Sequence, residues 1–359
     1  MSVFSTKNCR DILPGIQKIA VLRANALGDF LFTLPALEAL RHTYADAEIV
    51  LLAKNWHRAF LAKRPSPVDR VIAFPPYAGV NVENEEQENQ SELARFFQEM
   101  EQEHFDLALQ MQGGGRYSNP FVHQLHAGLT AGLRAPDAIA LDRWIPFVYF
   151  QSEIMRYLEV ASLVGAQPVI VEPRIQVTEA DIIESQWIID DDAHPLVVLH
   201  PGASDVRRRW PEQKFARIGD ALAAQGAHIV LTGVQEEADI VARIQEMMEA
   251  PVQNACAQLS LCGLTGLLSR SRLVISNDTG PLHLTYALGV PCIGLYWAYN
   301  ALTAGEMMRS HHRQIISWRM SCPLCGKDNS WGRCEHQTSF INDIGEEEIL
   351  AQVHEMRVL

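Results

Sequence analysis

The chain has 359 residues, of which 48% are apolar and 20% charged, a composition typical of globular proteins. Its 30 basic and 43 acidic side chains give a formal net charge of −13. This charge disfavours general binding of nucleic acid or anionic lipid, because the mean field of the protein repels phosphate. Any phosphate that the protein binds must therefore be held by a local arrangement of donors.

The length suits two domains of roughly 150–200 residues each. No stretch approaches the roughly 18 apolar residues that span a bilayer, and the N-terminal segment lacks the pattern of a secretory signal. The seven cysteines are an odd number and mostly scattered, which favours a reducing compartment over a disulfide framework. We therefore expect a cytoplasmic protein with at most peripheral membrane contact, at the inner face of the membrane.

The first half of the chain alternates predicted strands and helices. Apolar, partly β-branched runs predict buried strands, and apolar residues at helical spacing predict helices. In chain order, the predicted elements are a strand at 16–22, a helix at 30–42, strands at 48–53 and 70–74, a helix in the later half of the acidic stretch 81–103, a strand at 105–111 and a helix at 152–164. Such alternation predicts a parallel, doubly wound sheet.

The second half restarts the same alternation. Strands are predicted at 196–200, 228–232, 273–276 and 292–296, and helices at 211–225, 236–249, 261–269 and 281–288. We expect an α/β protein of two facing Rossmann-like domains with a ligand cleft between them. The expected division is an N-terminal domain over 1–175, a C-terminal domain over 176–340 and a C-terminal helix within 341–359 that could pack back on the first domain.

A polar loop after the first strand contains Asn25, Gly28 and Asp29. Open α/β sheets bind ligands in the loops that follow their strands. Gly28 permits a tight turn and close approach, and Asp29 stands at the beginning of a helix. Asp29 is either a functional carboxylate or simply a helix cap.

The loop that follows the strand at 196–200 is the basic exception in an acidic chain. It contains Gly202, Ser204 and the consecutive arginines 207–209, ahead of a helix that opens with Pro211. Amides, a hydroxyl and a guanidinium are the groups that bind a diphosphate. The alternative is a solvated basic turn.

Two further loops follow strands in the second half. Asn277, Asp278, Thr279 and Gly280 precede a helix that begins near Pro281, so they either present donors to an anion or serve as structural caps. The loop 232–237 offers glutamates that could bind a ribose diol, a role that the sequence supports only weakly.

Cysteines gather only near the C-terminus, where Cys322, Cys325, Cys334 and His336 share one loop. Three thiols and an imidazole match a structural Cys₃His zinc site in ligand type, and Cys322-x-x-Cys325 has the usual spacing. The wider gap to Cys334 is less usual. Reduced thiols that pack a loop are the alternative interpretation.

Four blocks together resemble glycosyltransferase family 9, the lipopolysaccharide heptosyltransferase family, in their order and spacing. The blocks are ALGDFLFTLPALEALR (26–41), HPGASDVRRRWP (200–211), LTGVQEEADI (231–240) and SNDTGPLHLTYALGVP (276–291). The resemblance implies a GT-B fold and an inverting, metal-independent transfer of a sugar, with heptose from ADP-heptose favoured. It also implies an acceptor that is a glycan or glycolipid such as lipopolysaccharide core.

The resemblance further implies roles for individual residues. The catalytic aspartate of the family falls on Asp29, with Asn25 and Gly28 on the acceptor side. The donor-binding positions fall on Ala203, Ser204, Arg208, Thr279 and Gly280 for the diphosphate, Asp278 for the sugar, Glu236 for the ribose and Leu259 for the base. The chain departs from the family where Arg208 replaces a lysine and where 23–26 lacks the common hydroxyl residues.

Two other classes of protein remain open from the sequence. A nucleotide-sugar epimerase can have a similar architecture and needs no acceptor, and a non-catalytic nucleotide-sugar binding protein would tolerate loss of the Asp29 carboxylate. A dehydrogenase is disfavoured because no G-x-G-x-x-G follows the first strand. We expect no cofactor for catalysis and no nucleic-acid partner.

Overall fold

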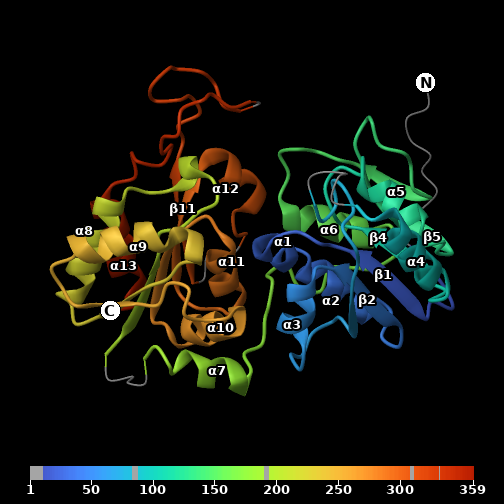
Figure 1. Ribbon diagram of the computed structural model, residues 1–359, viewed down its shortest axis with the longest axis horizontal. Coiled ribbons are helices and arrows are strands. Elements are labelled where there is room, and N and C mark those ends of the chain that lie inside the picture. Colours follow the sequence, from blue (N-terminus) through green and yellow to red (C-terminus); the bar gives the residue numbers. More distant parts are fainter. Residues whose placement is uncertain (1–10, 83–87, 190–193, 308–310, 331) are drawn as a thin grey trace. The chain divides into compact units, whose positions relative to one another are not determined.

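The computed structural model describes residues 11–82, 88–189, 194–307, 311–330 and 332–359. The chain divides into two compact units, Met1–Pro173 and Arg174–Leu359. Each unit is built on a six-stranded sheet in which all neighbouring strands are parallel, with helices on its faces (Figure 1). The fold is the predicted α/β fold of the GT-B type, with two Rossmann-like domains.

The first unit has the strand order β3-β2-β1-β4-β5-β6, which is that of a doubly wound sheet. Its strands are β1 (Lys18–Leu22), β2 (Glu48–Ala53), β3 (Arg70–Ala73), β4 (Leu107–Gln110), β5 (Leu129–Arg134) and β6 (Arg143–Pro146). Its helices are α1 (Leu27–Leu31), α2 (Leu34–Thr43), α3 (Asn55–Leu61), α4 (Gln90–Glu101), α5 (Ser118–His123) and α6 (Glu153–Ser162).

The second unit repeats this topology in the order β12-β11-β10-β7-β8-β9. Its strands are β7 (Leu196–His200), β8 (His228–Leu231), β9 (Val252–Asn254), β10 (Leu273–Asn277), β11 (Cys292–Trp297) and β12 (His312–Ser317). Its helices are α7 (Glu179–Ser185), α8 (Glu212–Ala223), α9 (Ala238–Met247), α10 (Leu261–Arg270), α11 (Gly280–Ala287), α12 (Ala298–Ala304) and α13 (Glu346–Met356), with short 3₁₀ turns η2 (Val206–Arg208) and η3 (Gln235–Glu237).

The helix predicted at 30–42 is broken into α1 and α2. Pro35 stands in the first turn of α2, where its missing N–H costs nothing. The chain turns between the two helices with a bond from the Thr33 amide to the Phe30 carbonyl (2.9 Å). The break leaves α1 as a short helix that begins directly after the loop from β1.

The C-terminal helix α13 belongs to the second unit. It contacts α8 and β12, and its Ile349 and Val353 are buried in the core of that unit. Lys214 of α8 donates to the Ile344 carbonyl (2.7 Å) just before the helix, and Arg272 donates to the Val358 carbonyl (2.7 Å) just after it. The apolar stripe of this helix thus completes the core of the second unit, and its expected packing on the first domain stays a prediction. Among the described helices, none has both the length and the apolar character needed to cross a membrane.

Candidate functional site

Three polar loops meet at the carboxyl edge of the second sheet. They follow β7, β8 and β10, which are neighbours in the order β10-β7-β8. Because parallel strands all end at the same edge, loops from adjacent strands lie side by side there. The residues that the sequence assigned to the diphosphate come from the loops after β7 and β10, so the topology gathers them.

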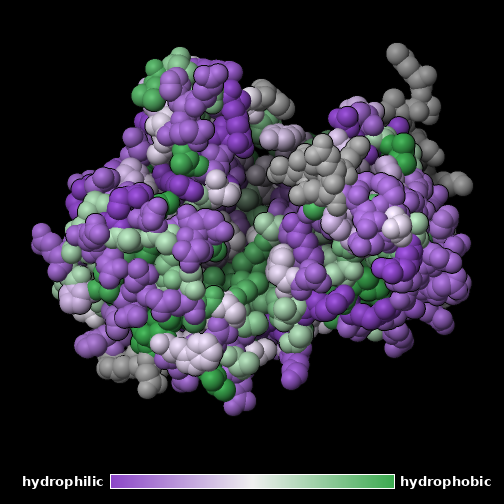
Figure 2. Space-filling model, viewed as in Figure 1, coloured by the Kyte–Doolittle hydropathy of each residue, from purple (hydrophilic) through white to green (hydrophobic). Residues whose placement is uncertain are grey.

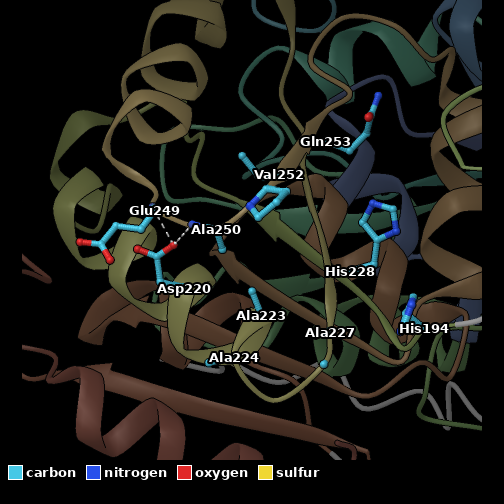
Figure 3. Close-up of a pocket in the computed structure, with 12 residues that line it drawn as sticks. His194, Asp220, Ala223, Ala224, Ala227, His228, Glu249, Ala250, Val252 and Gln253 are labelled. Atoms are coloured by element: carbon cyan, nitrogen blue, oxygen red, sulfur yellow. Dashed lines mark hydrogen bonds between the residues drawn. The ribbon is translucent and has the colours of Figure 1, made fainter.

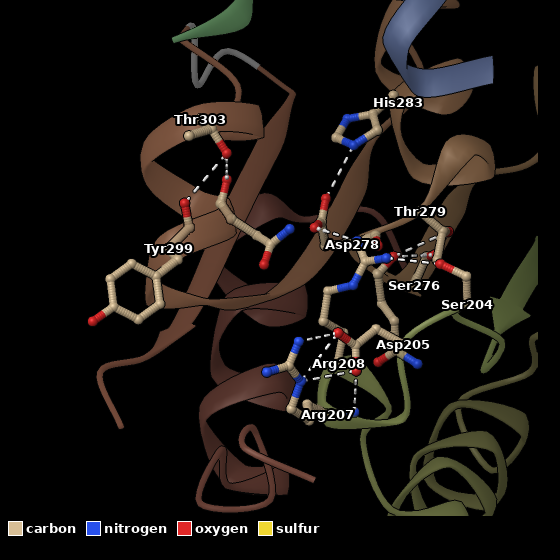
Figure 4. A network of polar contacts seen from close by, with 12 residues as sticks. Ser204, Asp205, Arg207, Arg208, Ser276, Asp278, Thr279, His283, Tyr299 and Thr303 are labelled. Carbon is tan, nitrogen blue, oxygen red and sulfur yellow. Dashed lines mark hydrogen bonds and ion pairs between the residues drawn. The ribbon is translucent and has the colours of Figure 1, made fainter. Parts of the chain in front are cut away.

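Arg208 links the two loops (Figure 4). Its Nη1 donates to Asp278 Oδ2 (3.1 Å) and to the Asp278 carbonyl (3.2 Å), and its Nη2 donates to Ser204 Oγ (2.9 Å). The Asp278 side chain is buried, whereas Ser204 is exposed and Arg208 keeps 21% of its side-chain area exposed. A guanidinium anchored on one side and open on the other can bind an anion.

The neighbouring arginines have different partners. Arg207 turns inward, where it is buried, pairs with both carboxylate oxygens of Asp205 and lies over the ring of Trp297 at 5.1 Å. Arg209 donates to the Ala203 carbonyl (2.8 Å). Two of the three consecutive arginines therefore stabilise the turn, whereas the Arg208 side chain stays partly exposed to solvent.

His283 of α11 also holds the carboxylate of Asp278 in place. The ring donates to Asp278 Oδ1 (3.0 Å) and to Glu306 Oε1 (2.8 Å), and all three side chains are buried. Burial alone would lower the pKa of His283, but the hydrogen bonds to the two carboxylates outweigh it and raise the pKa to about 9. Burial would raise the pKa of Asp278, but His283 and Arg208 together lower it. The cluster therefore presents an ionised Asp278 beside Arg208.

Asn277 ties the two loops through their main chains. Its Nδ2 donates to the Pro201 carbonyl (2.7 Å), and its Oδ1 accepts from the Trp210 amide (3.1 Å). The side chain is fully buried. Its amide thus satisfies a backbone acceptor and a backbone donor of the loop after β7, which fixes that loop against β10.

Helix α11 begins beside this cluster. Thr279 precedes it in extended backbone geometry, and within the described residues its side chain does not cap the helix. The Thr279 hydroxyl instead bonds to the Asn277 carbonyl (3.2 Å) and lies 3.3 Å from Ser276 Oγ. The first amides of α11, including that of Gly280, therefore have no hydroxyl cap from Thr279 and suit an anion.

The loop after β8 contributes Glu236 and Glu237 in η3. Glu236 is exposed, and Leu259 is half-buried in the loop that follows β9. Glu237, the other glutamate that the sequence offered in this loop, is buried: it accepts from the Val234 amide (3.0 Å) and lies 3.9 Å from His200 Nε2. A Cβ at Gly202 would overlap its carboxylate, so Gly202 permits the close approach of these loops.

In the first unit, Asp29 lies in the first turn of α1 after β1. Its Oδ1 accepts from Arg23 Nη2 (3.0 Å), its Oδ2 accepts from the Ala26 amide (3.2 Å), and 37% of the side chain is exposed. Asp29 is thus not the N-cap, which is Ala26, but it bonds to the N-cap amide from the first turn and presents its carboxylate to solvent. Asn25 is half-buried, and the tight turn expected at Gly28 is a buried helical turn of α1.

Arg23 is the residue of this loop whose role the sequence did not reveal. It is 1% exposed, donates to the carbonyls of Asp29 and Met111 (2.9 Å each) and lies over the Tyr157 ring at 4.7 Å. Arg23 therefore holds the main chain and the carboxylate of Asp29 in position. Its buried position depends on Tyr157 and Glu153 of α6, more than a hundred residues away, and no local pattern marks such a contact.

The cysteine-rich loop brings its four predicted ligands together. The ligand atoms of Cys322, Cys325, Cys334 and His336 all lie within 4.8 Å of one another. The three cysteines have free thiols. The cluster thus has the donor set and the proximity that a single metal ion needs.

A separate cavity of about 820 Å³ lies at the opposite edge of the second sheet (Figure 3). Its lining includes His228 at the beginning of β8, and Asp220 near the end of α8. Asp220 accepts from the amides of Glu249 (3.0 Å) and Ala250 (2.9 Å), so this carboxylate holds a loop. The cavity lies at the amino ends of the strands, away from the loops described above.

Comparison with known proteins gives one consistent picture. The model of glycosyltransferase family 9 (heptosyltransferase) matches residues 93–327. The lipopolysaccharide core heptosyltransferase OpsX of Haemophilus influenzae is 21% identical over 304 residues, covering 80% of each chain.

Two solved structures share the fold. A family 9 glycosyl transferase from Veillonella parvula gives a TM-score of 0.77 at 20% identity, covering 95% of this chain and 97% of that chain. The Escherichia coli ADP-heptose lps heptosyltransferase II gives 0.74 at 18% identity, covering 95% and 98%.

Proposed function

The chain belongs to glycosyltransferase family 9, the family that its four sequence blocks resemble, and we propose that this glycosyltransferase moves heptose from ADP-heptose to a glycan or glycolipid such as lipopolysaccharide core. The observation that carries the proposal is the cluster of Arg208, Ser204 and Asp278 at the carboxyl edge of the second sheet. In a chain of net charge −13, this cluster offers a guanidinium, a hydroxyl and a helix N-terminus at one place.

The donor is bound by the second unit in this proposal. Arg208, Ser204, the Ala203 turn and the first turn of α11 at Thr279 and Gly280 hold the diphosphate, and Asp278 accepts from a hydroxyl of the sugar. Glu236 binds the ribose, and Leu259 packs against the base. No metal takes part in catalysis, because Arg208 and the helix N-terminus offset the charge that builds on the leaving diphosphate.

Asp29 is the general base in this proposal. A sugar hydroxyl is too weakly acidic to attack unaided, so a carboxylate must take its proton as the new bond forms. Attack on the anomeric carbon occurs on the face opposite the leaving diphosphate, which inverts its configuration. Arg23 holds Asp29 in place during the transfer, and Asn25 and Gly28 line the acceptor side.

The acceptor determines where the enzyme works. A lipid-linked core glycan is presented at the inner face of the cytoplasmic membrane, and the enzyme meets it there by peripheral contact. The donor and the acceptor are the only partners that the proposal requires.

Asp29→Asn tests the proposed reaction. The variant keeps the shape of the side chain but removes the proton acceptor, so turnover of ADP-heptose with an acceptor glycan should fall roughly a hundredfold or more. ADP binding, measured by calorimetry, should be unchanged because the donor residues lie in the second unit. Asp46→Asn, an exposed carboxylate of the same unit, is the matched control.

Two outcomes would contradict the proposal. Unchanged turnover in Asp29→Asn would remove that residue from the role of base. Consumption of ADP-heptose at the same rate without any acceptor glycan would point to a reaction other than transfer, as an epimerase would show.

A further inference from the structure

The loop between β12 and α13 stands out from the body of the second unit (Figure 1). Near its start, Trp318 is 64% exposed and Leu324 is 67% exposed, whereas Phe340 and Ile341 near its end are buried in the core of the unit. Figure 2 shows hydrophobic and hydrophilic surface mixed on this projection. Between these ends, residues 323–328 are exposed and residues 332–337 are almost all exposed. Proteins hold stretches that bury so little apolar surface with metals or disulfides.

The turn at Cys322 is closed by main-chain bonds. The Gly326 amide donates to the Cys322 carbonyl (2.9 Å), and the Cys322 amide donates to the Lys327 carbonyl (2.9 Å). Gly326 has a φ of 72°, in the left-handed region that glycine adopts without strain. The turn places the thiols of Cys322 and Cys325 on the same side.

The second half of the loop brings Cys334 and His336 to these thiols. The distance from Cys322 Sγ to His336 Nδ1 is 3.7 Å. In a tetrahedral zinc site, with Zn–S near 2.3 Å and Zn–N near 2.0 Å, the sulfur and nitrogen are about 3.5 Å apart. The separation therefore fits two ligands of one ion. Cys322 itself is buried in the core of the unit, which anchors the cluster.

Asn329 connects this cluster to the loop after β7. Its Nδ2 donates to Cys334 Sγ (3.7 Å) and its Oδ1 accepts from the Cys334 amide (3.1 Å), as an outer partner of a metal ligand does. The same Oδ1 accepts from Arg207 Nη1 (3.5 Å). Arg207 is the inward arginine that pairs with Asp205, next to Ser204.

From these contacts we propose that Cys322, Cys325, Cys334 and His336 bind one zinc ion, and that the zinc-bound loop fixes the phosphate-binding turn through Asn329 and Arg207. The ion is structural, because four protein ligands complete its tetrahedral shell and leave no position for substrate. The second half of the inference rests on the proposed donor site; the first half does not.

Metal analysis of the full chain, purified without added metal, tests the first half. We expect about one zinc per chain, lost in Cys325→Ser and in Cys334→Ser and retained in the control Cys262→Ser, a half-buried cysteine of α10. Iron in place of zinc would overturn the identity of the ion. Metal-free protein, with these cysteines as free thiols or as a disulfide in mass spectrometry, would overturn the site.

ADP binding tests the second half. Cys334→Ser should weaken ADP binding and raise the KM for the donor about tenfold, the low end for loss of an outer support, while kcat changes little. Asn329→Leu should produce the same loss of ADP affinity while the zinc is retained. Unchanged ADP affinity in both variants would overturn the link to the phosphate-binding turn. If wild-type protein binds zinc but not ADP, the proposed donor site fails and the metal site stands.

Discussion

His283 is a buried cation between two buried carboxylates. It bonds to Asp278 and Glu306, which come from different elements of the second unit. Each carboxylate would be costly to bury without a partner, and the imidazolium serves both. The charge of His283 therefore helps to keep Asp278 ionised and in place beside Arg208.

This arrangement predicts a pH dependence of stability. The pKa of His283 is about 9 in the folded protein against 6.5 for an ordinary histidine, so its contribution is complete below pH 6.5 and is lost as the pH rises toward 9. The contribution is on the order of 3 kcal/mol. The free energy of unfolding, measured with urea from pH 6 to pH 9.5, should fall across this window in the wild type.

Two variants check that His283 is the source. His283→Gln should be less stable at pH 6 and should lose this part of the slope, whereas His354→Gln, an exposed histidine of α13, should keep it. A wild-type slope that persists in His283→Gln would assign the effect to another group.

At the scale of elements, the loops after β7 and β8 are packed too closely to admit a side chain at position 202. Gly202 lies against the carboxylate of Glu237, which in turn binds the Val234 amide. An added methyl group must displace either this carboxylate or the backbone at Gly202, which leads to Ser204 two residues later. The close contact is therefore a requirement of the proposed donor site as well as of the fold.

Gly202→Ala should destabilise the protein by about 1–3 kcal/mol, the usual effect of overpacking. It should also weaken ADP binding, because the turn moves, and calorimetry and thermal unfolding measure the two effects. Gly345→Ala is the control, since the nearest atom to its added Cβ is Glu347 Oε2 at 3.8 Å and its φ is −84°. Wild-type affinity in Gly202→Ala would show that the turn tolerates the shift.

The predictability of the strands follows the continuity of their apolar runs. The continuous apolar runs of β2 and β7 were predicted with their observed bounds, because central parallel strands are buried on both faces. The strands β5, β6, β9 and β12 were missed, because polar or small residues interrupt their apolar runs. Of these, β6, β9 and β12 lie at the sheet edges, where only part of each is buried. The break at Pro35 was missed because the apolar stripe continues across it.

Only the residues of the candidate site that the sequence of their own loop marks were predictable. The loops with Ser204, Arg208 and Asp278 stood out as polar runs after apolar strands. The partner of Asp29 and the second carboxylate on His283 did not, since Arg23 is held by α6 and Glu306 lies beyond β11. Such contacts depend on the fold of the whole unit rather than on sequence spacing.

At the scale of the whole molecule, each unit has a sheet and a core of its own. All the proposed donor residues lie in the second unit. A ligand that binds only the folded form adds about 2.7 kcal/mol to stability at a hundred times its Kd. The stabilisation by a nucleotide should therefore be concentrated in one of the two units.

Hydrogen exchange with and without ADP checks this expectation. Amides of the loops at 200–211 and 276–283 should exchange more slowly when ADP is bound, while amides of β1 and β2 should change little. Protection of β1 and β2 with no change in these loops would place the nucleotide in the first unit.

The ion pair between Arg208 and Asp278 limits which ligands the proposed donor site can bind. Asp278 is an internal counterion, so the guanidinium is already neutralised before any nucleotide arrives. An uncharged nucleoside offers nothing that competes with this carboxylate, whereas a pyrophosphate brings enough negative charge to share the arginine with it. In the proposed donor site, Arg208 is therefore available only to ligands of high charge density.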